Sequence, residues 1–444
     1  MSLSTRDRRM LAAALVAAIA ALPAIALRAL CVGRGCEARI PVRAEVPFCS
    51  LAEDVRGALA AGYRAGRSPE ALAVTGDAVV RGADGLRDLD PAWPGIDAAG
   101  AAVPLLFSGA GVGSGTLPEG VRLDAVAPTV AEIIDLDRPH PEVRSGEALP
   151  GVAAGPAPRL ALQVVWKGVG SEDLRRRPDA WPVLRRLLQD GAGTLDARTG
   201  SLPLDPTAVL ATIGTGGLPR QHGIIGTLVR NEEGEVAEVG RPRAPLSVIA
   251  TLGDDLVELR RSRVGVVGTH PADRAAVGGG WYVGADEPDV IVARGPVEAQ
   301  VEAANRLLAS GYGEDAEPDL LVVAMHGAVP RLDGALGSLI VAAEAAAPGA
   351  TAVVVTSTGS SGAEGAPALT HDQVRRRVEA DDDVPEGAVA ATALGGLFLD
   401  QDVLAGTGAS AQVVVRALAR VRAPEEEAFA DTFSGVAVEF ARYC

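Results

Sequence analysis

Aromatic residues are scarce in this chain, and their scarcity excludes one class of binding site. Phe, Trp and Tyr together make up only 3% of the 444 residues. A groove that binds sugars or nucleic-acid bases stacks them on aromatic rings, so no such groove is expected here. Ala, Gly and Pro are abundant instead, which we attribute to coding bias rather than to a mechanism.

Basic residues are also in deficit. The chain has 41 Lys and Arg against 57 Asp and Glu, which gives a formal net charge of −16 at pH 7. Nucleic acids and anionic lipids bind to positive protein surfaces, so neither is expected as the main partner.

The sequence also lacks a G-x-S-x-G motif, a CxxC pair and a Walker phosphate-binding loop. With 48% hydrophobic residues, the chain is long enough for one large α/β domain or two smaller ones.

The N-terminus has the pattern of a segment that directs export. Three arginines between residues 6 and 9 precede an apolar run over residues 10–22, and the small residues at 24–26 offer a signal-peptidase site. Alternatively, the apolar run extends to Leu27 and anchors the chain in the membrane, although about 18 residues is the lower limit for a span. We predict that residues 1–30 are a signal peptide or a membrane anchor. The rest of the protein is then extracytoplasmic, either secreted or anchored to the cytoplasmic membrane.

The four cysteines lie near the two ends of the chain, and none lies in its interior. Outside the cytoplasm, an even number of cysteines is typical of disulfides, and four cysteines allow three pairings. We favour Cys31 with Cys36 and Cys49 with Cys444, because the second bond would join the two ends of the chain. Metal binding is the weaker alternative, because no histidine lies near any of the four.

Apolar runs of strand length alternate with helical stretches along most of the chain. The pattern predicts strands at 72–74, 103–107, 160–166, 264–267, 290–292, 320–324 and 351–357, and helices at 51–65, 130–134, 181–189 and 332–347. The strands at 264–267 and 290–292 are expected to be short and buried. This alternation predicts an α/β fold with a largely parallel sheet sandwiched by helices. Residues 150–158, rich in Gly, Ala and Pro, are predicted to be a linker, and residues 388–444 to be mainly helical.

The most specific motif lies in residues 206–226, which read PTAVLATIGTGGLPRQHGIIG. The pattern TIGTG-x-x-P-x-x-HGIIG resembles the segment after the nucleophile in the alkaline phosphatase superfamily, and most of all its type I phosphodiesterase/nucleotide pyrophosphatase branch. The resemblance implies an alkaline phosphatase-like α/β fold. In an active member it also implies two metal ions that activate a nucleophile and hold phosphoryl oxygens. His222 fits the pattern, and the resemblance gives it a mainly architectural role after the nucleophile helix.

A second resemblance lies earlier in the chain. The stretch VPLLFSGAGVG at 103–113, followed by APT at 127–129, is similar to the C-terminal part of the same superfamily. Because this part comes first, we predict a circular permutation in which residues 41–150 complete the sheet begun by residues 159–360. The alternative is a separate small domain, but the first segment contains too few strands for a stable sheet of its own. Residues 361–444 resemble nothing specific and are expected to pack on the same domain.

The residues that should bind the metals are mostly replaced. The first strand of the family ends in Asp followed by Gly, whereas here Lys167 precedes the glycine. Pro206 stands at the position of the nucleophile, with Thr207 beside it. A strand end that should read Asp-His-Gly has Thr358 before its glycine. Because a lysine places positive charge where a dication needs negative ligands, the resemblance implies a chain with degenerate metal ligands and no metal cofactor.

Few other side chains have the chemistry of a metal ligand. At the third strand end, His326 has it, but a lone histidine there is more often structural. Asp205 fits either a ligand or the N-cap of a helix that starts at the next residue. Asp333 lies within a predicted helix and His371 at the start of another, and we expect both to be exposed to solvent.

Together these features predict an exported, catalytically inactive alkaline phosphatase-like protein that acts as a binding or scaffold protein at the cell envelope. It would bind an envelope protein, or a small anionic ligand through Lys167, Thr207 and Thr358. The alternative is an active metal-dependent phosphoesterase or phosphodiesterase with a rearranged site. In that case Thr207 is the nucleophile, and Asp205 and His326, with Asp333 as a further candidate, bind zinc or another divalent metal. The N-terminal segment contacts the membrane if it is not cleaved, and no nucleic acid partner is expected.

Overall fold

The computed structural model describes residues 48–76, 79–81, 93–95, 101–360, 368–423, 427–440 and 444. The predicted export segment and the first two cysteines lie outside these residues. No helix in the described part of the chain is both long and apolar enough to cross a bilayer.

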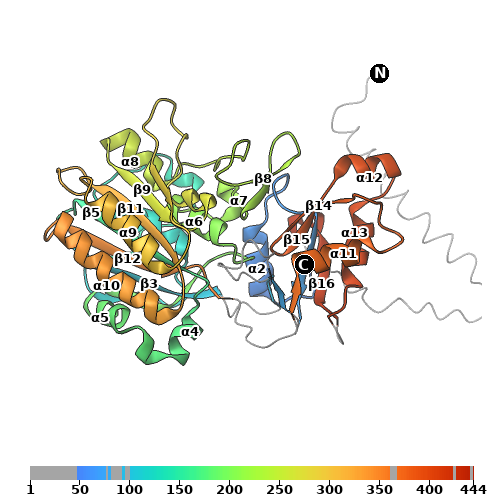
Figure 1. The fold of residues 1–444 in the computed structure, drawn as a ribbon, viewed down its shortest axis with the longest axis horizontal. Coiled ribbons are helices and arrows are strands. Elements are labelled where there is room, and N and C mark those ends of the chain that lie inside the picture. The colour runs from blue at the N-terminus through green and yellow to red at the C-terminus, as the bar shows by residue number, and fades with distance from the viewer. Residues whose placement is uncertain are drawn as a thin grey trace, which may run out of the picture. The chain divides into compact units, whose positions relative to one another are not determined.

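An eight-stranded sheet is the largest element of the fold (Figure 1). Its strands, in spatial order, are β10 (Asp289–Val292), β9 (Val264–Gly268), β11 (Asp319–His326), β5 (Leu160–Lys167), β12 (Thr351–Ser357), β3 (Ala102–Gly109), β6 (Ala192–Arg198) and β4 (Gly115–Thr116). Neighbouring strands are parallel except around β3, which runs antiparallel to both β12 and β6. The fold therefore belongs to the predicted α/β class, with a largely parallel sheet.

The central strands are buried on both faces. Every residue of β5 and of β12 is buried. Alternate residues of β5 belong to two different apolar cores, with Ala161 and Val165 in one and Leu162 and Val164 in the other. Continuous apolar runs are typical of parallel strands covered on both faces, which is why these strands could be predicted from the sequence.

Helices cover both faces of this sheet (Figure 1). One core contains residues of α3 (Val126–Ile133), α6 (Pro206–Thr215) and α8 (Leu252–Arg260), and the other contains residues of α5 (Pro182–Asp190), α9 (Val297–Leu308) and α10 (Val329–Ala346). All residues of α6 are buried, and the hydroxyls of its three threonines make hydrogen bonds inside the protein. Shorter helices are α4 (Ser171–Arg176), α7 (Pro219–His222) and the 3₁₀ helices Leu123–Ala125, Pro141–Val143, Pro178–Ala180 and Pro271–Ala276.

A second, four-stranded antiparallel sheet joins residues from both ends of the described chain. Its spatial order is β14 (Val389–Ala393), β15 (Gly396–Leu399), β1 (Ala71–Thr75) and β16 (Phe429–Ser434). It has its own apolar core, completed by α11 (His371–Glu379), α12 (Gln401–Thr407) and α13 (Ala411–Ala419). The prediction that residues 388–444 are mainly helical is therefore wrong in part, because three short strands with little apolar alternation lie in this segment.

The remaining elements are small. Two-stranded ladders join β2 (Val79–Arg81) to β13 (Ala368–Thr370) and β7 (Leu228–Arg230) to β8 (Val236–Glu238), and two further helices are α2 (Glu53–Gly62) and α14 (Gly435–Glu439). Residues 290–292 do form a strand, as predicted, but the expectation that this strand is buried is wrong. Val290 and Val292 of β10 are 39% and 37% exposed, because β10 is the outer strand of the large sheet.

Residues 41–150 supply strands to both sheets. β3 lies between β12 and β6 and is thus part of the sheet formed by residues 159–360. β1 lies in the second sheet, between β15 and β16. The large sheet therefore needs a strand from the first segment, whereas the circular permutation itself stays a prediction.

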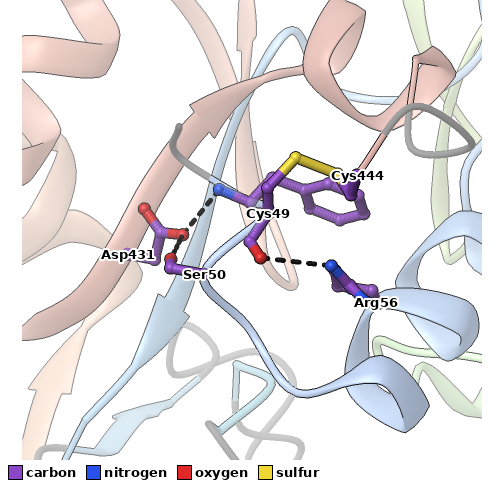
Figure 2. Close-up of a disulfide and its surroundings, with 6 residues drawn as sticks. Cys49, Ser50, Arg56, Asp431 and Cys444 are labelled. Carbon is purple, nitrogen blue, oxygen red and sulfur yellow. Dashed lines mark hydrogen bonds between the residues drawn. A yellow bond between two sulfur atoms is a disulfide. The ribbon is translucent and has the colours of Figure 1, made fainter. Parts of the chain in front are cut away.

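The predicted disulfide between Cys49 and Cys444 is confirmed (Figure 2), with 5.2 Å between the two Cα atoms. Asp431 of β16 makes hydrogen bonds to the residues on either side of Cys49. Its carboxylate accepts the backbone N–H of Phe48 at 2.7 Å and the hydroxyl of Ser50 at 3.2 Å. The segment before α2 is therefore fixed to Cys444 by a covalent bond and to β16 by hydrogen bonds to Asp431.

Candidate functional site

The candidate site lies where the parallel strands of the large sheet end. β5 ends at Lys167, β11 ends at His326, and Thr358 directly follows β12. In the ladders, His326 is opposite Lys167, and Ser357 is opposite Trp166. Because the carboxyl ends of parallel strands meet at one edge of a sheet, three of the residues singled out in the sequence lie together.

Lys167 is fully buried, and its ammonium group has two side-chain partners. Its Nζ lies 2.7 Å from Asp273 Oδ2 and 2.5 Å from Thr269 Oγ1. The same carboxylate oxygen accepts the backbone N–H groups of Thr269 and His270. A buried charge is tolerated when an opposite charge and hydrogen bonds surround it, and this cluster supplies both.

The 3₁₀ helix Pro271–Ala276, which follows β9, carries Asp273. Its start is a capping box, in which the His270 side chain accepts a backbone N–H of the helix and Asp273 accepts the His270 N–H. No motif in the sequence pointed to Thr269, His270 or Asp273. The available signal was Lys167 itself, because a lysine at the end of an apolar strand requires a buried carboxylate from another part of the chain.

Thr358 fixes the turn that follows β5. Its Oγ1 accepts the backbone N–H of Gly168 at 3.0 Å, and its own N–H donates to the carbonyl oxygen of Trp166 at 3.1 Å. Gly168 has a φ of +76°, a conformation that favours glycine. His326 Nδ1 lies 3.3 Å from the carbonyl oxygen of Lys167. These contacts bind the ends of three strands to one another.

A separate buried group lies at the start of α6. Asp205 is its N-cap, and its carboxylate accepts the N–H of Thr207 at 2.8 Å and that of Thr227 at 3.0 Å. The Thr207 and Thr227 hydroxyl oxygens lie 2.9 Å apart. Burial raises the pKa of Asp205, while the hydrogen bonds from Thr227 and Thr207 act in the opposite direction. The N-cap interpretation is confirmed, with Pro206 at the first helical position, where a missing N–H costs nothing.

The buried polar side chains around Lys167 and Asp205 therefore form two separate groups. Lys167 forms one group with Thr269 and Asp273, and Asp205 forms the other with Thr207 and Thr227. Within the described part of the chain, no hydrogen bond or ion pair joins the side chains of one group to those of the other.

The residues at this edge do not fit the metal pair that the resemblance implies. The position of the first ligand holds an ammonium group, that of the nucleophile a proline, and that of a further ligand pair a threonine and a glycine. Among the described residues, no three His, Cys, Asp or Glu side chains are grouped so that they could hold a metal ion.

Two expectations of solvent exposure are wrong. Asp333 is buried and accepts the N–H groups of Val183 and Leu184, each at 2.9 Å, so it caps the start of α5. Burial raises the pKa of this carboxyl. His371 is buried too, and its Nε2 accepts the indole N–H of Trp93 at 3.0 Å. Burial lowers the pKa of His371 to about 4. In both cases the covering element is remote in sequence, so the pattern of one helix could not reveal it.

His222 has the hydrogen bonds of an architectural residue. It is fully buried, its Nδ1 accepts the N–H of Ile224, and its Nε2 lies 3.1 Å from Thr212 Oγ1. Burial, together with the charges of Arg64 and Arg67, lowers the pKa of His222 to about 3. The imidazole is therefore neutral at physiological pH.

No protein-family model and no curated protein matches the chain. Among solved structures, the chain is similar to wild-type alkaline phosphatase PafA, with a TM-score of 0.46 and 14% sequence identity. The match covers 60% of this chain and 76% of that chain. This likeness assigns no role to any residue.

Proposed function

We propose that this chain is an exported, catalytically inactive protein of the alkaline phosphatase-like superfamily that acts as a binding or scaffold protein at the cell envelope. The observation that carries the proposal is the buried pair of Lys167 and Asp273. The sequence resemblance assigns a metal ligand to the position of Lys167. A side chain of the protein supplies the positive charge there instead, together with its counter-charge.

Electrostatics favours the Lys167–Asp273 ion pair over a metal ion at this position. Two unit charges 4 Å apart interact by about 4 kcal/mol at the effective dielectric constant of 20 that suits protein sites, and a dication doubles that to about 8 kcal/mol. A metal next to Lys167 would meet this repulsion. It would also compete for Asp273 Oδ2 with the ammonium group and two backbone N–H groups.

The start of α6 supports the same proposal. A nucleophile must be accessible to the substrate and must be activated by a base or a metal. Pro206 has no nucleophilic group, and the hydroxyl of Thr207 is buried against Thr227. The nearby carboxylate of Asp205 is engaged as a helix cap. The groups at the positions of a nucleophile and its base therefore stabilise the start of α6 instead of carrying out hydrolysis.

Two further parts of the proposal rest on separate observations. Export is supported by the N-terminal sequence pattern and by the Cys49–Cys444 disulfide, because such bonds persist in oxidising compartments. Circular permutation is supported by β3, which comes from the first segment and lies inside the sheet formed by the second. We propose an envelope protein or a small anionic ligand as the partner.

The test is metal content by elemental mass spectrometry on the exported chain, purified without chelator and dialysed. Hydrolysis of p-nitrophenyl phosphate and bis-p-nitrophenyl phosphate is measured on the same sample. We expect far less than one zinc, manganese, iron or calcium per chain and no hydrolysis above the buffer rate.

Two variants serve as comparisons. Lys167→Asp, which places a second carboxylate beside Asp273, should bind added zinc more tightly than the unchanged chain, whereas Lys167→Met should not. One or two tightly held metals in the unchanged chain, together with hydrolysis that Thr207→Val abolishes, would contradict the proposal and favour the active phosphoesterase.

A further inference from the structure

A cavity of about 350 Å³ lies against the same 3₁₀ helix that carries Asp273. While Asp273 contacts Lys167, the next two residues, Arg274 and Ala275, line the cavity. The loop of residues 239–247 supplies most of the other lining residues. The volume lies within the range of about 300 to 1,000 Å³ that is typical of small-molecule sites.

Most of the lining is apolar. Ile224 and Val239 are buried in the wall, and Pro242, Pro245 and Leu246 come from the loop. The Leu246 side chain is 53% exposed, so part of this apolar surface is in contact with water. A ligand that covered it would gain about 25 cal/mol for each Å² removed from water.

The charges of the lining are all positive. Arg241 and Arg274 line the cavity and no Asp or Glu does, although the chain as a whole carries a net charge of −16. Arg241 pairs with Glu238 at 3.1 Å, and Arg274 pairs with Glu287 at 3.0 Å.

These two ion pairs are open to solvent. The arginine side chains are 51% and 30% exposed, and their partners are 33% and 67% exposed. Exposed pairs of this kind contribute little free energy. An anionic ligand can therefore displace the glutamates and accept paired N–H groups from either guanidinium.

The cavity is formed by backbone that other contacts hold in place. Arg67 donates to the carbonyl oxygen of Leu246 at 3.0 Å, and the N–H of Val248 donates to the carbonyl oxygen of His222 at 2.9 Å. At Gly240, which has a φ of +82°, an added Cβ would lie 2.4 Å from the carbonyl oxygen of Pro271. The loop thus packs directly on the 3₁₀ helix, and a preformed site lowers the cost of binding.

We propose that this cavity binds a small amphipathic anion, a molecule with one carboxylate or phosphate group on an apolar body. The anionic group lies between Arg241 and Arg274, and the apolar body covers Ile224, Val239 and Leu246. This inference is independent of the proposed loss of metals, because neither the Lys167 group nor the Asp205 group lines the cavity. Its failure would leave the metal measurement unaffected.

Isothermal titration of the folded protein with a matched set of probes tests the proposal. Octanoate and octyl phosphate carry both parts of the ligand and distinguish its two possible head groups, octanol carries only the tail, and acetate and inorganic phosphate carry only the charge. We expect at least one amphipathic anion to bind at a single site at least tenfold more tightly than octanol and than its own head group.

Variants locate the site. Arg241→Gln and Arg274→Gln should each weaken binding at least tenfold. Arg243→Gln is the matched control, because Arg243 lies on the same loop with its side chain 78% exposed but does not line the cavity; it should change the dissociation constant less than twofold. Leu246→Ser should weaken the binding of octanoate and octyl phosphate more than that of acetate and inorganic phosphate.

Three results would overturn the proposal. These are the absence of saturable binding of either anion at about 1 mM, equal affinity for octanol, and equal weakening by Arg243→Gln and the two cavity variants. Arg241 is exposed at the surface, so its variant remains informative even if Arg274→Gln fails to fold.

Discussion

The end of β5 and the surroundings of α6 both bury ionisable side chains, but they do so in different ways. At the end of β5, Lys167 lies in an ion pair with Asp273. Around α6, Asp205 and His222 are held by hydrogen bonds from neutral groups. Burial raises the pKa of Asp205 and lowers that of His222 to about 3, so each shifts toward its neutral form. In the first region an opposite charge compensates the buried charge. In the second region burial instead shifts the pKa of each group toward its neutral form.

The largest effect is expected where charge compensates charge. Lys167→Met leaves Asp273 buried without its counter-charge, and removing one member of a buried pair costs about 3 to 5 kcal/mol of unfolding free energy. Urea unfolding measures this loss. The double variant Lys167→Met/Asp273→Asn should recover much of it, because no charge is then left unpaired.

An exposed ion pair provides the control for the Lys167 and Asp273 variants. Arg176 and Glu172 pair at 3.2 Å with both side chains at least half exposed. Arg176→Met should change the unfolding free energy by less than about 0.5 kcal/mol. If Lys167→Met costs no more than this control, the ion pair at the end of β5 does not hold the fold.

The second prediction concerns pH and tests the neutral form of His222. Its pKa is about 3 in the folded protein and 6.5 as the ordinary value, so the unfolded chain binds more protons between these pH values. Its contribution to stability is complete above pH 6.5 and is lost as the pH falls. Between pH 6.5 and 4.5 the loss should be roughly 2 to 3 kcal/mol, since one pKa unit corresponds to about 1.4 kcal/mol.

Unfolding free energies measured across this range in His222→Gln should show a flatter acid slope. Part of the slope should remain, because His371 is also buried with a pKa lowered to about 4. His140→Gln, a change at a side chain that is 78% exposed, is the control. An unchanged slope in His222→Gln would mean that folding does not lower the pKa of His222.

The smallest effect is expected at Thr207. Thr207→Val removes the hydroxyl contact with Thr227 and should cost about 1 kcal/mol, the usual value for one buried hydrogen bond. Thr207→Ser keeps the hydroxyl and serves as the matched variant. A Thr207→Val protein with unchanged unfolding free energy would show that this contact does not stabilise the start of α6.

A structural feature could be predicted from the sequence when the residues that cause it lie close together in the chain. β12 was predicted with the bounds Thr351–Ser357 that the structure has, because a fully buried parallel strand is a continuous apolar run. Asp205 was predicted as a possible N-cap because Pro206 follows it, and both signals lie within two residues.

The remaining features depend on residues that meet only in the folded chain. Asp273 lies 106 residues from Lys167, and Trp93 lies 278 residues from His371. Periodicity within one helix says which face is apolar but not which distant element covers a polar residue. For that reason the partner of Lys167 was missed, and His371 and Asp333 were wrongly expected at the surface.

The disulfide between Cys49 and Cys444 also has a mechanical consequence. The bond joins two cysteines that are 395 positions apart in the sequence, so tension applied to the chain before Cys49 reaches Cys444 without passing through the residues between them. Through Asp431, the same tension is shared with β16. A pull on the N-terminal side would therefore load α2 through the chain and β16 through Asp431 at the same time.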